Sequence, residues 1–337
     1  MGAELLLLPL TPLYGGVVRL RAAAYRRGLL KTIRLPAPVV SVGNLTFGGT
    51  GKTPTVLALA RDLARRGRRP AVLTRGYRRR GSKPLVLIGP AAGASAEAAG
   101  DEPLEMARRL PGVPVIVDAD RARGGREALR LGADVLLLDD GFQHLTLARD
   151  LNLLLIDAGN PWGGGRLPPR GKLREPVAAV RRADAVLVTK LGESGKTFDA
   201  VVADIRRLAP DMPVLGSRLA PGRWLTAAGP RPVNELAGRR VFAFAGIARP
   251  GGFVEVLRAL GAEVVGMRWF DDHHRYRASD LRRLAAEAEG LGAVPVTTSK
   301  DAVKLPADGP QWVLEVDVVP VNDGWDALWA LAAGVLP

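Results

Sequence analysis

We predict an α/β protein with a mostly parallel sheet flanked by helices, and three features of the sequence lead to this fold class. Short apolar runs such as 38–43 and 133–138 alternate with segments of helical periodicity, which is typical of β-α-β units. A glycine-rich loop joins the first run to a helix, and the second run ends in two aspartates. Ligands of open α/β sheets bind at the carboxyl ends of the strands, so both positions are candidate binding sites.

The length and composition indicate a globular chain of about two domains. At ~150 residues per domain, the length favours two domains, and the 337 residues are 47% hydrophobic, which is enough for a large core. Gly and Pro, with 40 and 26 residues, stay below the share typical of low-complexity chains. We expect an N-terminal segment over 1–35, a core domain over 36–225 and a smaller C-terminal α/β lobe over 226–337.

The residue types that are absent or rare exclude several kinds of site. The chain has no cysteine, which excludes disulfides, thiolate metal sites and a cysteine nucleophile. Its net charge of +14 fits nucleic acid, an anionic membrane or a phosphorylated substrate as partner, or simply a basic proteome. Aromatic residues are 5% of the chain and do not interleave with the basic runs, as stacking on nucleic acid requires. We therefore expect no nucleic-acid partner.

The first 35 residues have the pattern of a membrane-associating helix. The apolar stretch 4–20 is interrupted by two prolines and two glycines, whereas a membrane span needs ~20 mostly apolar residues. No basic residue precedes it, which argues against a signal peptide. From Val17 to Ile33, apolar residues recur at helical spacing among arginines, a pattern that suits an anionic bilayer surface. We expect a peripheral anchor; the alternative is an ordinary helix packed on the domain.

The glycine-rich loop has the composition of a phosphate-binding loop, or P-loop. It follows a β-branched run and precedes a helical pattern over Thr55–Arg66, the context in which such a motif is credible. Glycines let backbone amides approach phosphate oxygens, Lys52 reaches the β- and γ-phosphates, and the Thr53 hydroxyl is placed to bind Mg²⁺. The strict pattern has glycine at position 46, where this chain has Thr46. The residues predicted to bind the nucleotide are Thr46, Gly48, Gly49, Thr50, Gly51, Lys52 and Thr53.

Two further strands are expected to end in charged residues beside this loop. The run Ala133–Leu138 is followed by Asp139 and Asp140, the Walker-B arrangement in which a carboxylate reaches Mg²⁺ directly or through water. Adjacent residues of a continuing strand point to opposite sides, so one of the two would contact the metal. Alternatively, the pair only starts a turn. Arg75 follows the strand 70–74, where a basic loop either holds a phosphate or is simply solvated.

A third group of carboxylates and imidazoles is a candidate for acid–base chemistry. Asp101 and Glu102 precede the helical pattern 104–109, where Asp101 alternatively caps the helix. The segment Asp271–Tyr276 contains His273 and His274, and a histidine can position a carboxylate base or stabilise its charge. Spacing alone does not show that this segment meets Asp101.

The alternative class is a P-loop GTPase or metallochaperone that acts as a nucleotide switch. A guanine-selecting site needs an Asn/Thr-Lys-x-Asp motif, but Thr189 and Lys190 are followed by Leu191 and then by Gly192 in place of the aspartate. A metallochaperone also needs cysteines or clustered histidines, which the chain lacks. In the C-terminal lobe, the loop 246–252 follows a strand over 240–245 but has no Gly-Lys-Thr/Ser triplet, so we expect no second nucleotide site there.

Taken together, the motifs resemble one known family. NLTFGGTGKTP, RGYRRR, GDEP, DDGFQH, LREP, FDDHH and TSKDAVKL occur in that order between residues 44 and 305. This set resembles the tetraacyldisaccharide 4'-kinases, the lipid A 4'-kinases of the Gram-negative envelope, and the resemblance extends over about residues 4–330. The late glycine cluster with Thr46 is also what this family shows.

The resemblance implies a reaction and roles for the candidate residues. It implies transfer of the γ-phosphoryl of ATP, with Mg²⁺, to the 4'-hydroxyl of an acylated glucosamine disaccharide 1-phosphate, giving lipid IVA at the cytoplasmic face of the inner membrane. By the same resemblance, Asp101 activates the hydroxyl and His273 is its partner, with His274 as the second choice. Lys52 and Thr53 contact phosphate and metal, as do Asp139 and Asp140. Residues implied near the active site are Glu102, Arg121, His144 and Glu175, to which Arg75 is added from its place after a strand.

Overall fold

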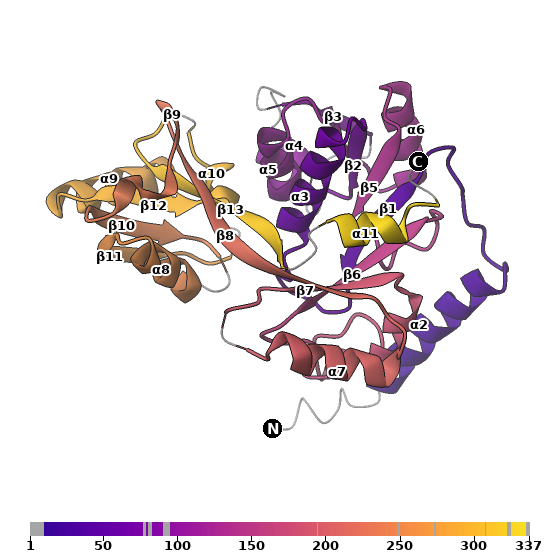
Figure 1. The fold of residues 1–337 in the computed structure, drawn as a ribbon. Helices are drawn as coiled ribbons and strands as arrows, with labels where there is room; N and C mark the ends of the chain where they lie inside the picture. Colours follow the sequence, from indigo (N-terminus) through magenta and orange to yellow (C-terminus); the bar gives the residue numbers. More distant parts are fainter. Residues whose placement is uncertain are drawn as a thin grey trace. The chain divides into compact units, whose positions relative to one another are not determined.

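The computed structural model describes residues 10–76, 79, 83–89, 95–193, 195–247, 250–272, 274–306, 308–321 and 325–334 (Figure 1). Its contacts group the chain into two compact units. Unit 1 comprises residues 1–93, 106–219 and 318–337, and unit 2 comprises 94–105 and 220–317. No sequence feature indicated that 94–105 groups with the C-terminal part or that the last residues return to unit 1. The boundaries predicted at residues 35 and 225 stay predictions.

The sheet of unit 1 is parallel except at one edge. Its strand order is β8-β7-β6-β1-β5-β2-β4-β3, and over the described residues the pairings within this order are parallel except that of β3 with β4. The central strands are buried throughout, which explains why their sequences are apolar at consecutive positions and not at alternate ones. The strands are β1 Val39–Asn44, β2 Pro70–Thr74, β3 Leu85–Leu87, β4 Val115–Val117, β5 Val135–Asp139, β6 Leu151–Asp157, β7 Ala185–Thr189 and β8 Val214–Thr226.

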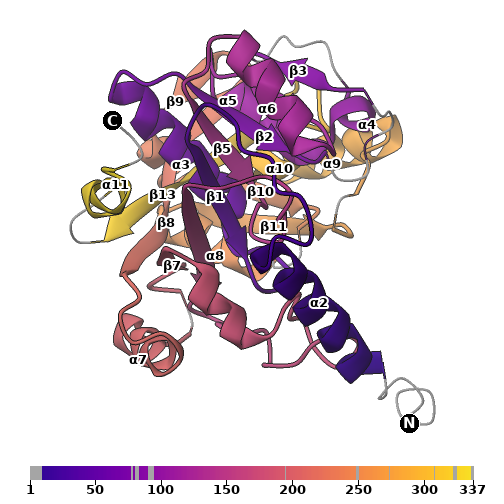
Figure 2. The same cartoon turned by 90° about the vertical axis from the view of Figure 1, so that its right-hand side faces the viewer.

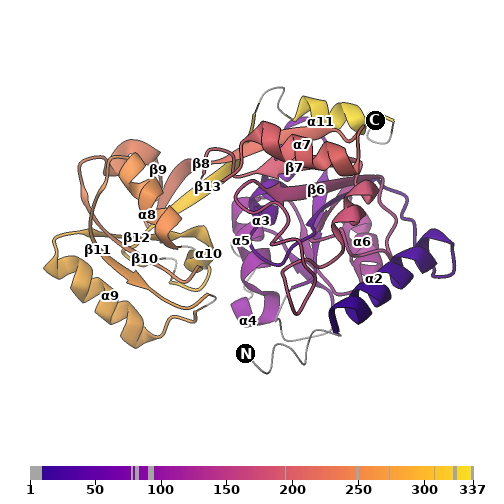
Figure 3. The same cartoon turned by 90° about the horizontal axis from the view of Figure 1, so that it is seen from below.

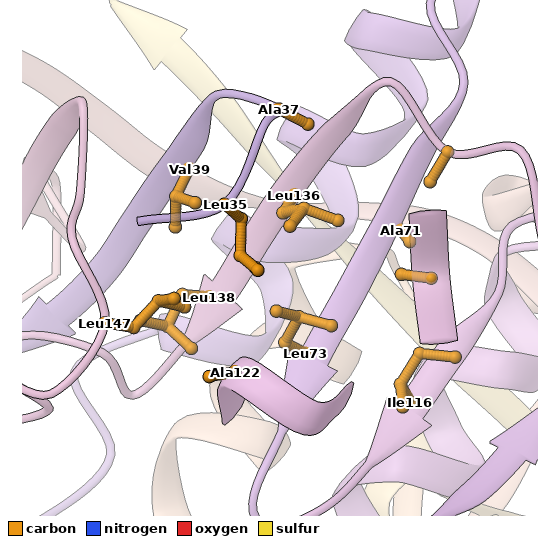
Figure 4. Close-up of a cluster of buried hydrophobic side chains, with 12 residues drawn as sticks. Leu35, Ala37, Val39, Ala71, Leu73, Ile116, Ala122, Leu136, Leu138 and Leu147 are labelled. Carbon is orange, nitrogen blue, oxygen red and sulfur yellow. The ribbon is translucent and has the colours of Figure 1, made fainter. Parts of the chain in front are cut away.

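Helices cover both faces of this sheet. On one face, Ala122 of α6 packs with Leu73, Leu136 and Leu138 in a buried cluster that also contains Leu35 (Figure 4). A second cluster on the same face joins strands β6 and β7 to α7 and the 3-10 helix η1, because Leu154 of β6 is in register with Gly43, which lies on the Val39 side of β1. Helix α3 packs against β1, β2 and β5 on the opposite side (Figure 1). The helices are α2 Leu10–Arg26, α3 Lys52–Arg65, α6 Arg121–Arg130, η1 Val177–Arg182, α7 Phe198–Leu208 and α11 Asp326–Leu331, with α5 Asp101–Arg109 divided between the units.

The N-terminal helix differs from its prediction at both ends. Helix α2 begins by Leu10 and continues through Pro12, which the first turn tolerates because no amide donor is needed there. It ends at Arg26 and is followed by Gly28 in the left-handed region (φ 70°). The expected continuation to Ile33 is wrong, because the Ile33 amide donates to the Thr146 carbonyl at 2.8 Å and its side chain packs against the core.

Helix α2 lies at the periphery of unit 1 (Figure 2). Its outer side carries Leu13, Val17 and Leu20, which are 63%, 59% and 72% exposed. On its inner side, the Tyr14 hydroxyl donates to the Arg174 carbonyl at 2.9 Å. Among the described residues, no helix has the length and apolar character to cross a bilayer.

Unit 2 is a smaller α/β layer built around β10. Alternate residues of β10 face opposite sides: Val241 and Ala243 pack in the cluster with α8, whereas Phe242 and Phe244 pack in the cluster with α9. The two helices lie on opposite faces of the sheet (Figure 3). The strand order is β11-β10-β12-β13-β8, and β9 pairs with β8. The elements are α4 Ala96–Ala99, β9 Gly229–Arg231, η2 Val233–Leu236, β10 Arg240–Ala245, α8 Pro250–Ala259, β11 Glu263–Trp269, α9 Ala278–Gly290, β12 Val294–Thr298, α10 Ser299–Ala302 and β13 Trp312–Val321.

The predicted fold class is confirmed, with local corrections. The mostly parallel sheet, its flanking helices and the smaller α/β layer are present. The P-loop helix begins at Lys52 and not at Thr55, because the last glycine of the loop starts the helix directly. Near the carboxyl end of that helix, Ala64 is exposed.

Substitution of Gly43 tests how closely β1 packs against the turn after β5. A Cβ added at Gly43 would lie 2.6 Å from Phe142 Cβ and 2.7 Å from Phe142 N. Because the opposing atoms include backbone, we expect Gly43→Ala to lower the free energy of unfolding by about 1–3 kcal/mol. The measurement is the urea midpoint.

Gly16→Ala is the matched control, since Gly16 lies in helix α2 and an added Cβ meets nothing within 4 Å. It is expected to leave stability unchanged or raise it by about 0.5–1 kcal/mol. Equal midpoints for Gly43→Ala and the wild type would contradict the close packing.

Candidate active site

The P-loop connects β1 to α3 and leaves an open cradle. Gly51, at the start of α3, has φ 83°, and Gly48 has φ 124°, a region that residues with a side chain rarely adopt. A Cβ added at Gly48 or Gly49 meets no atom within 4 Å, so the space beside these residues is open to a ligand. The side-chain Nδ2 of Asn44 donates to the Thr46 carbonyl at 2.8 Å, and Lys52 Nζ donates to Asn44 Oδ1 at 3.3 Å.

The two threonines of the loop occupy different surroundings. Thr46 is buried and pairs in an antiparallel bridge with Leu173, and its Cγ2 would lie 2.9 Å from a Cβ added at Gly163. The side chain at position 46 is therefore part of the local packing, which a glycine, the residue of the strict motif, could not supply. Thr50 is also buried, and its hydroxyl has no hydrogen-bond partner within the described chain. A buried hydroxyl without a partner beside an open loop indicates a place where a ligand completes the bonding.

The aspartate pair after β5 is divided by a sharp turn. The strand ends at Asp139, and Asp140 adopts the left-handed conformation (φ 51°), so the premise of a continuing strand with opposite-facing aspartates is wrong. The Asp140 carboxylate lies 3.6 Å from Lys52 Nζ and accepts hydrogen bonds at 2.7 Å from Arg174 Nη1. Burial by itself raises the pKa of Asp140, but the charges of Lys52 and Arg174 bring that pKa below its ordinary value. The carboxylate is therefore ionised at neutral pH.

Asp139 lies deeper at the same sheet edge. It is 3% exposed, and its Oδ2 accepts a hydrogen bond from Thr74 Oγ1, at the end of β2, at 2.8 Å. Arg121 is buried as well, and this burial lowers the pKa of its guanidinium. The negative charge of Asp139 raises that pKa, whereas the positive charge of Arg75 lowers it further. Arg75 itself is exposed. These contacts bring the ends of β2 and β5 and the start of α6 into one charged region.

The residues available to a magnesium ion are few. Over the ranges that the structure describes, no cluster of three or more acidic or histidine side chains forms a ready metal cage. Mg²⁺ is commonly bound through one or two carboxylates together with substrate phosphates and waters. Thr53, half-buried in the first turn of α3, and the ionised Asp140 with Asp139 fit that requirement.

His144 and Glu175 are both engaged in local contacts. His144 Nε2 lies 2.8 Å from Thr146 Oγ1, and burial, aided by the charges of Arg121 and Arg149, lowers the pKa of His144 to about 4. Glu175 is buried and accepts a hydrogen bond from Arg182 Nη2 at 2.8 Å. The structure thus places Glu175 in an ion pair with Arg182.

Sequence reasoning missed the residue next to Glu175. Arg174 holds Asp140, and its guanidinium carbon lies 5.2 Å from the centre of the Phe47 ring in the P-loop. The LREP motif contains Arg174, but its spacing gives no indication of which of its charged residues reaches the loop. Gln143 was also missed. Its Nε2 donates to the Asn44 carbonyl at 3.0 Å, and nothing in the spacing of the DDGFQH motif indicates that this side chain reaches the end of β1.

Asp101 and Glu102 belong to unit 2, where they form the first turn of α5 after Gly100 (φ 93°). The helix begins at Asp101 and not at Leu104, so Asp101 lies inside the helix and the capping alternative is not supported. Two carboxylates at a helix N-terminus are stabilised by the helix dipole.

The histidine predicted to assist Asp101, His273, lies outside the described residues. The side chain of its neighbour His274 contacts other residues. Its Nε2 lies 3.1 Å from Asp280 Oδ2, and its ring stacks on that of Phe270 with 4.4 Å between the ring centres. Asp280 also accepts the Arg277 amide at 2.9 Å, so this contact belongs to the start of helix α9.

The lowered pKa of His144 predicts sensitivity to acid. The unfolded state binds a proton near the ordinary pKa of 6.5, whereas the folded state does so only near about 4. Stability is therefore fully present above the unfolded value and falls as the pH drops between these two values. We expect His144→Gln to lose less stability than the wild type between about pH 7.5 and about pH 5, measured by urea unfolding.

Thr146→Val is the control for this experiment, because it removes the hydrogen bond and keeps the imidazole. Its stability should follow the pH dependence of the wild type. If His144→Gln and the wild type lose stability in parallel, His144 is not the group responsible.

Comparison with known proteins identifies the family. The family model for Tetraacyldisaccharide-1-P 4'-kinase matches residues 3–332. The tetraacyldisaccharide 4'-kinase of Anaeromyxobacter sp. (strain K) is 48% identical over 297 residues, covering 86% of this chain and 78% of that protein. The enzyme of that name from Syntrophus aciditrophicus is 45% identical over 303 residues, covering 86% and 81%.

A solved structure agrees with these relatives. The crystal structure of LpxK from Aquifex aeolicus in complex with ATP is 34% identical, with a TM-score of 0.80, and the match covers 98% of both chains. The whole-chain family match and the similar ATP-bound structure favour the kinase over the nucleotide-switch alternative. The chain belongs to the tetraacyldisaccharide 4'-kinase family, the ATP-dependent kinases of lipid A biosynthesis.

Proposed function

We propose that this chain transfers the γ-phosphoryl of ATP to the 4'-hydroxyl of an acylated glucosamine disaccharide 1-phosphate, giving lipid IVA. The observation that carries the nucleotide half of this proposal is the open P-loop, in which Lys52 is held between Asn44 and Asp140. The acceptor half rests on the family, whose members are named for this substrate.

The nucleotide side of the reaction needs neutralisation of charge on the transferred group. The amides of the loop 48–53 and the Lys52 ammonium group bind the phosphates. Thr53 and the two aspartates would hold Mg²⁺, which would neutralise negative charge on the transferred group. Arg174 keeps Asp140 in place and ionised, so that this carboxylate balances Lys52 before the phosphates arrive.

The acceptor side needs a base for the sugar hydroxyl. We assign this role to Asp101, with His273 as its partner and Glu102 beside it in the first turn of α5. A carboxylate that accepts the hydroxyl proton raises the nucleophilicity of the attacking oxygen. The basic side chains of Arg121 and Arg149, which lower the pKa of His144, favour a negatively charged acceptor in unit 1.

The location we propose is the cytoplasmic face of the inner membrane, with peripheral association through α2. Support comes from the exposed Leu13, Val17 and Leu20 and from the arginines on the same helix. Apolar side chains with arginines around them suit the interface of an anionic bilayer. The protein can then reach a glycolipid acceptor while that lipid stays in the membrane. The proposal includes no nucleic-acid partner.

The direct test of the function is an assay of the purified protein. Incubation with ATP, Mg²⁺ and the disaccharide 1-phosphate in detergent should add one phosphate at the 4' position, detected by mass. Chelation of Mg²⁺ should abolish the product, and Lys52→Ala should reduce turnover by at least about a hundredfold, as expected for a lost phosphate contact. Full turnover by Lys52→Ala would rule out the P-loop as the nucleotide site.

Substitution of Asp101 tests the proposed base. Asp101→Ala should lower kcat by about 10²–10⁴-fold, as is typical of a lost general base, with little change in the affinity for ATP. Steady-state kinetics with each substrate varied separates the two effects. Asp308→Ala, which changes an exposed carboxylate of unit 2, is the control. An unchanged kcat for Asp101→Ala would remove Asp101 from this role.

A further inference from the structure

Thr189 ends strand β7 and Lys190 directly follows it. Together they form the incomplete guanine-type motif, which the nucleotide chemistry above does not use. Both side chains reach the P-loop. Thr189 Oγ1 donates to the Thr50 carbonyl at 2.9 Å, and Lys190 Nζ donates to the Gly49 carbonyl at 2.6 Å. Two successive peptide groups of the loop are therefore held from the end of one strand.

These bonds fix the direction of the loop amides. In a trans peptide, the carbonyl and the following N–H point in opposite directions. Holding the Gly49 carbonyl therefore turns the Thr50 amide away from Lys190, and holding the Thr50 carbonyl turns the Gly51 amide away from Thr189. Within the described chain, neither amide has an acceptor in a backbone or side-chain hydrogen bond.

The next peptide group of the loop is held in the same manner from helix α3. The Gly51 carbonyl accepts hydrogen bonds from the hydroxyl and the amide of Thr55, at 2.8 and 3.1 Å. The Lys52 amide consequently points away from the helix interior. Amides directed outward from the groups that hold their carbonyls are what an anion needs to be bound by backbone N–H groups.

The two side chains are themselves firmly held. Lys190 Nζ also donates to Asp157 Oδ2, at the end of β6, at 2.7 Å, and these side chains are only 12% and 6% exposed. Asp157 in turn accepts the Gly159 amide at 2.9 Å. Lys190 has φ 59°, an uncommon conformation for a residue with a side chain, and Thr189 is 1% exposed. Such a constrained pair can hold a glycine-rich loop that has little rigidity of its own.

We propose that Thr189 and Lys190 are positioning residues for ATP: they hold the Thr50 and Gly49 carbonyls so that the loop amides are oriented before the nucleotide binds. Preorganised donors need no rearrangement when the anion arrives, so their loss is felt in nucleotide binding. The glycolipid does not depend on these carbonyls. The inference rests on the proposed function only in taking ATP as the nucleotide.

The test uses Thr189→Val, which keeps the shape and removes the donor, and Lys190→Met, which keeps the length and removes the charge. Each should raise KM for ATP by about five- to twentyfold, the size expected for one lost hydrogen bond to a loop that must remain ordered. KM for the glycolipid should stay within about twofold of the wild type. The rise in melting temperature on adding ATP and Mg²⁺, measured without glycolipid, should shrink in both variants.

Matched variants separate positioning from general damage. Thr189→Ser restores the hydroxyl and should behave like the wild type. Ser217 of β8 has a buried hydroxyl that donates at 3.3 Å to the carbonyl of Val188, the residue before Thr189 in β7. Ser217→Ala removes this hydrogen bond, which does not involve the loop, and should leave KM for ATP unchanged. Because Lys190→Met removes the cation beside Asp157, Asp157→Asn combined with Lys190→Met removes both charges and should show the same ATP defect. If Thr189→Val does not fold, Lys190→Met and the double variant with Asp157→Asn still test whether loop positioning affects ATP binding.

Two outcomes would overturn the proposal. One is an unchanged KM for ATP together with an unchanged ATP-induced melting shift in the Lys190 variants. The other is an equal rise in KM for both substrates, matched by Ser217→Ala, which would indicate loss of packing and not of loop orientation. The melting shift needs no acceptor, so a failure to phosphorylate the glycolipid would refute the proposed function and leave this test intact.

Discussion

The parallel alignment of the strands in unit 1 is the constraint on which its functional region depends. Parallel neighbours end at the same edge of a sheet, and Val42 of β1 is in register with Asp139 of β5, while Asp157 of β6 is in register with Thr189 of β7. Residues far apart in the sequence therefore meet where β1 continues into the P-loop. An antiparallel arrangement of the same strands would send half of these ends to the opposite edge.

Charge pairing at this edge stabilises the charged side chains beside the P-loop. A buried ammonium or carboxylate group is costly unless it has a partner. Lys52 is balanced by Asp140, Asp140 by Arg174, and Lys190 by Asp157. A bound phosphate can replace the carboxylate as the partner of Lys52 without exposing a lone charge, because Arg174 continues to balance Asp140.

Helix α2 joins the proposed membrane surface to this region by direct contacts. The Tyr14 hydroxyl donates to the backbone of Arg174, and Arg21 donates to the carbonyl of Gln143 at 3.2 Å. Both contacted residues also bind groups of the P-loop region, namely Asp140 and Asn44. The helix expected to be a separate anchor is thus part of the framework around the nucleotide site, while its outer side keeps its exposed leucines.

Local periodicity and motifs of adjacent residues were enough to predict the α/β class, the P-loop, the strand that leads into Asp139 and the family. The sequence by itself did not determine where α2 ends, since Ile33 is drawn out of the helical pattern by a bridge to Leu147. Nor did it reveal the contacts of Arg174, Gln143, Thr189 and Lys190, which span 33 to 141 positions of the chain. Such contacts depend on strand order and register, which only the tertiary structure fixes, because side chains so far apart in sequence leave no common local pattern.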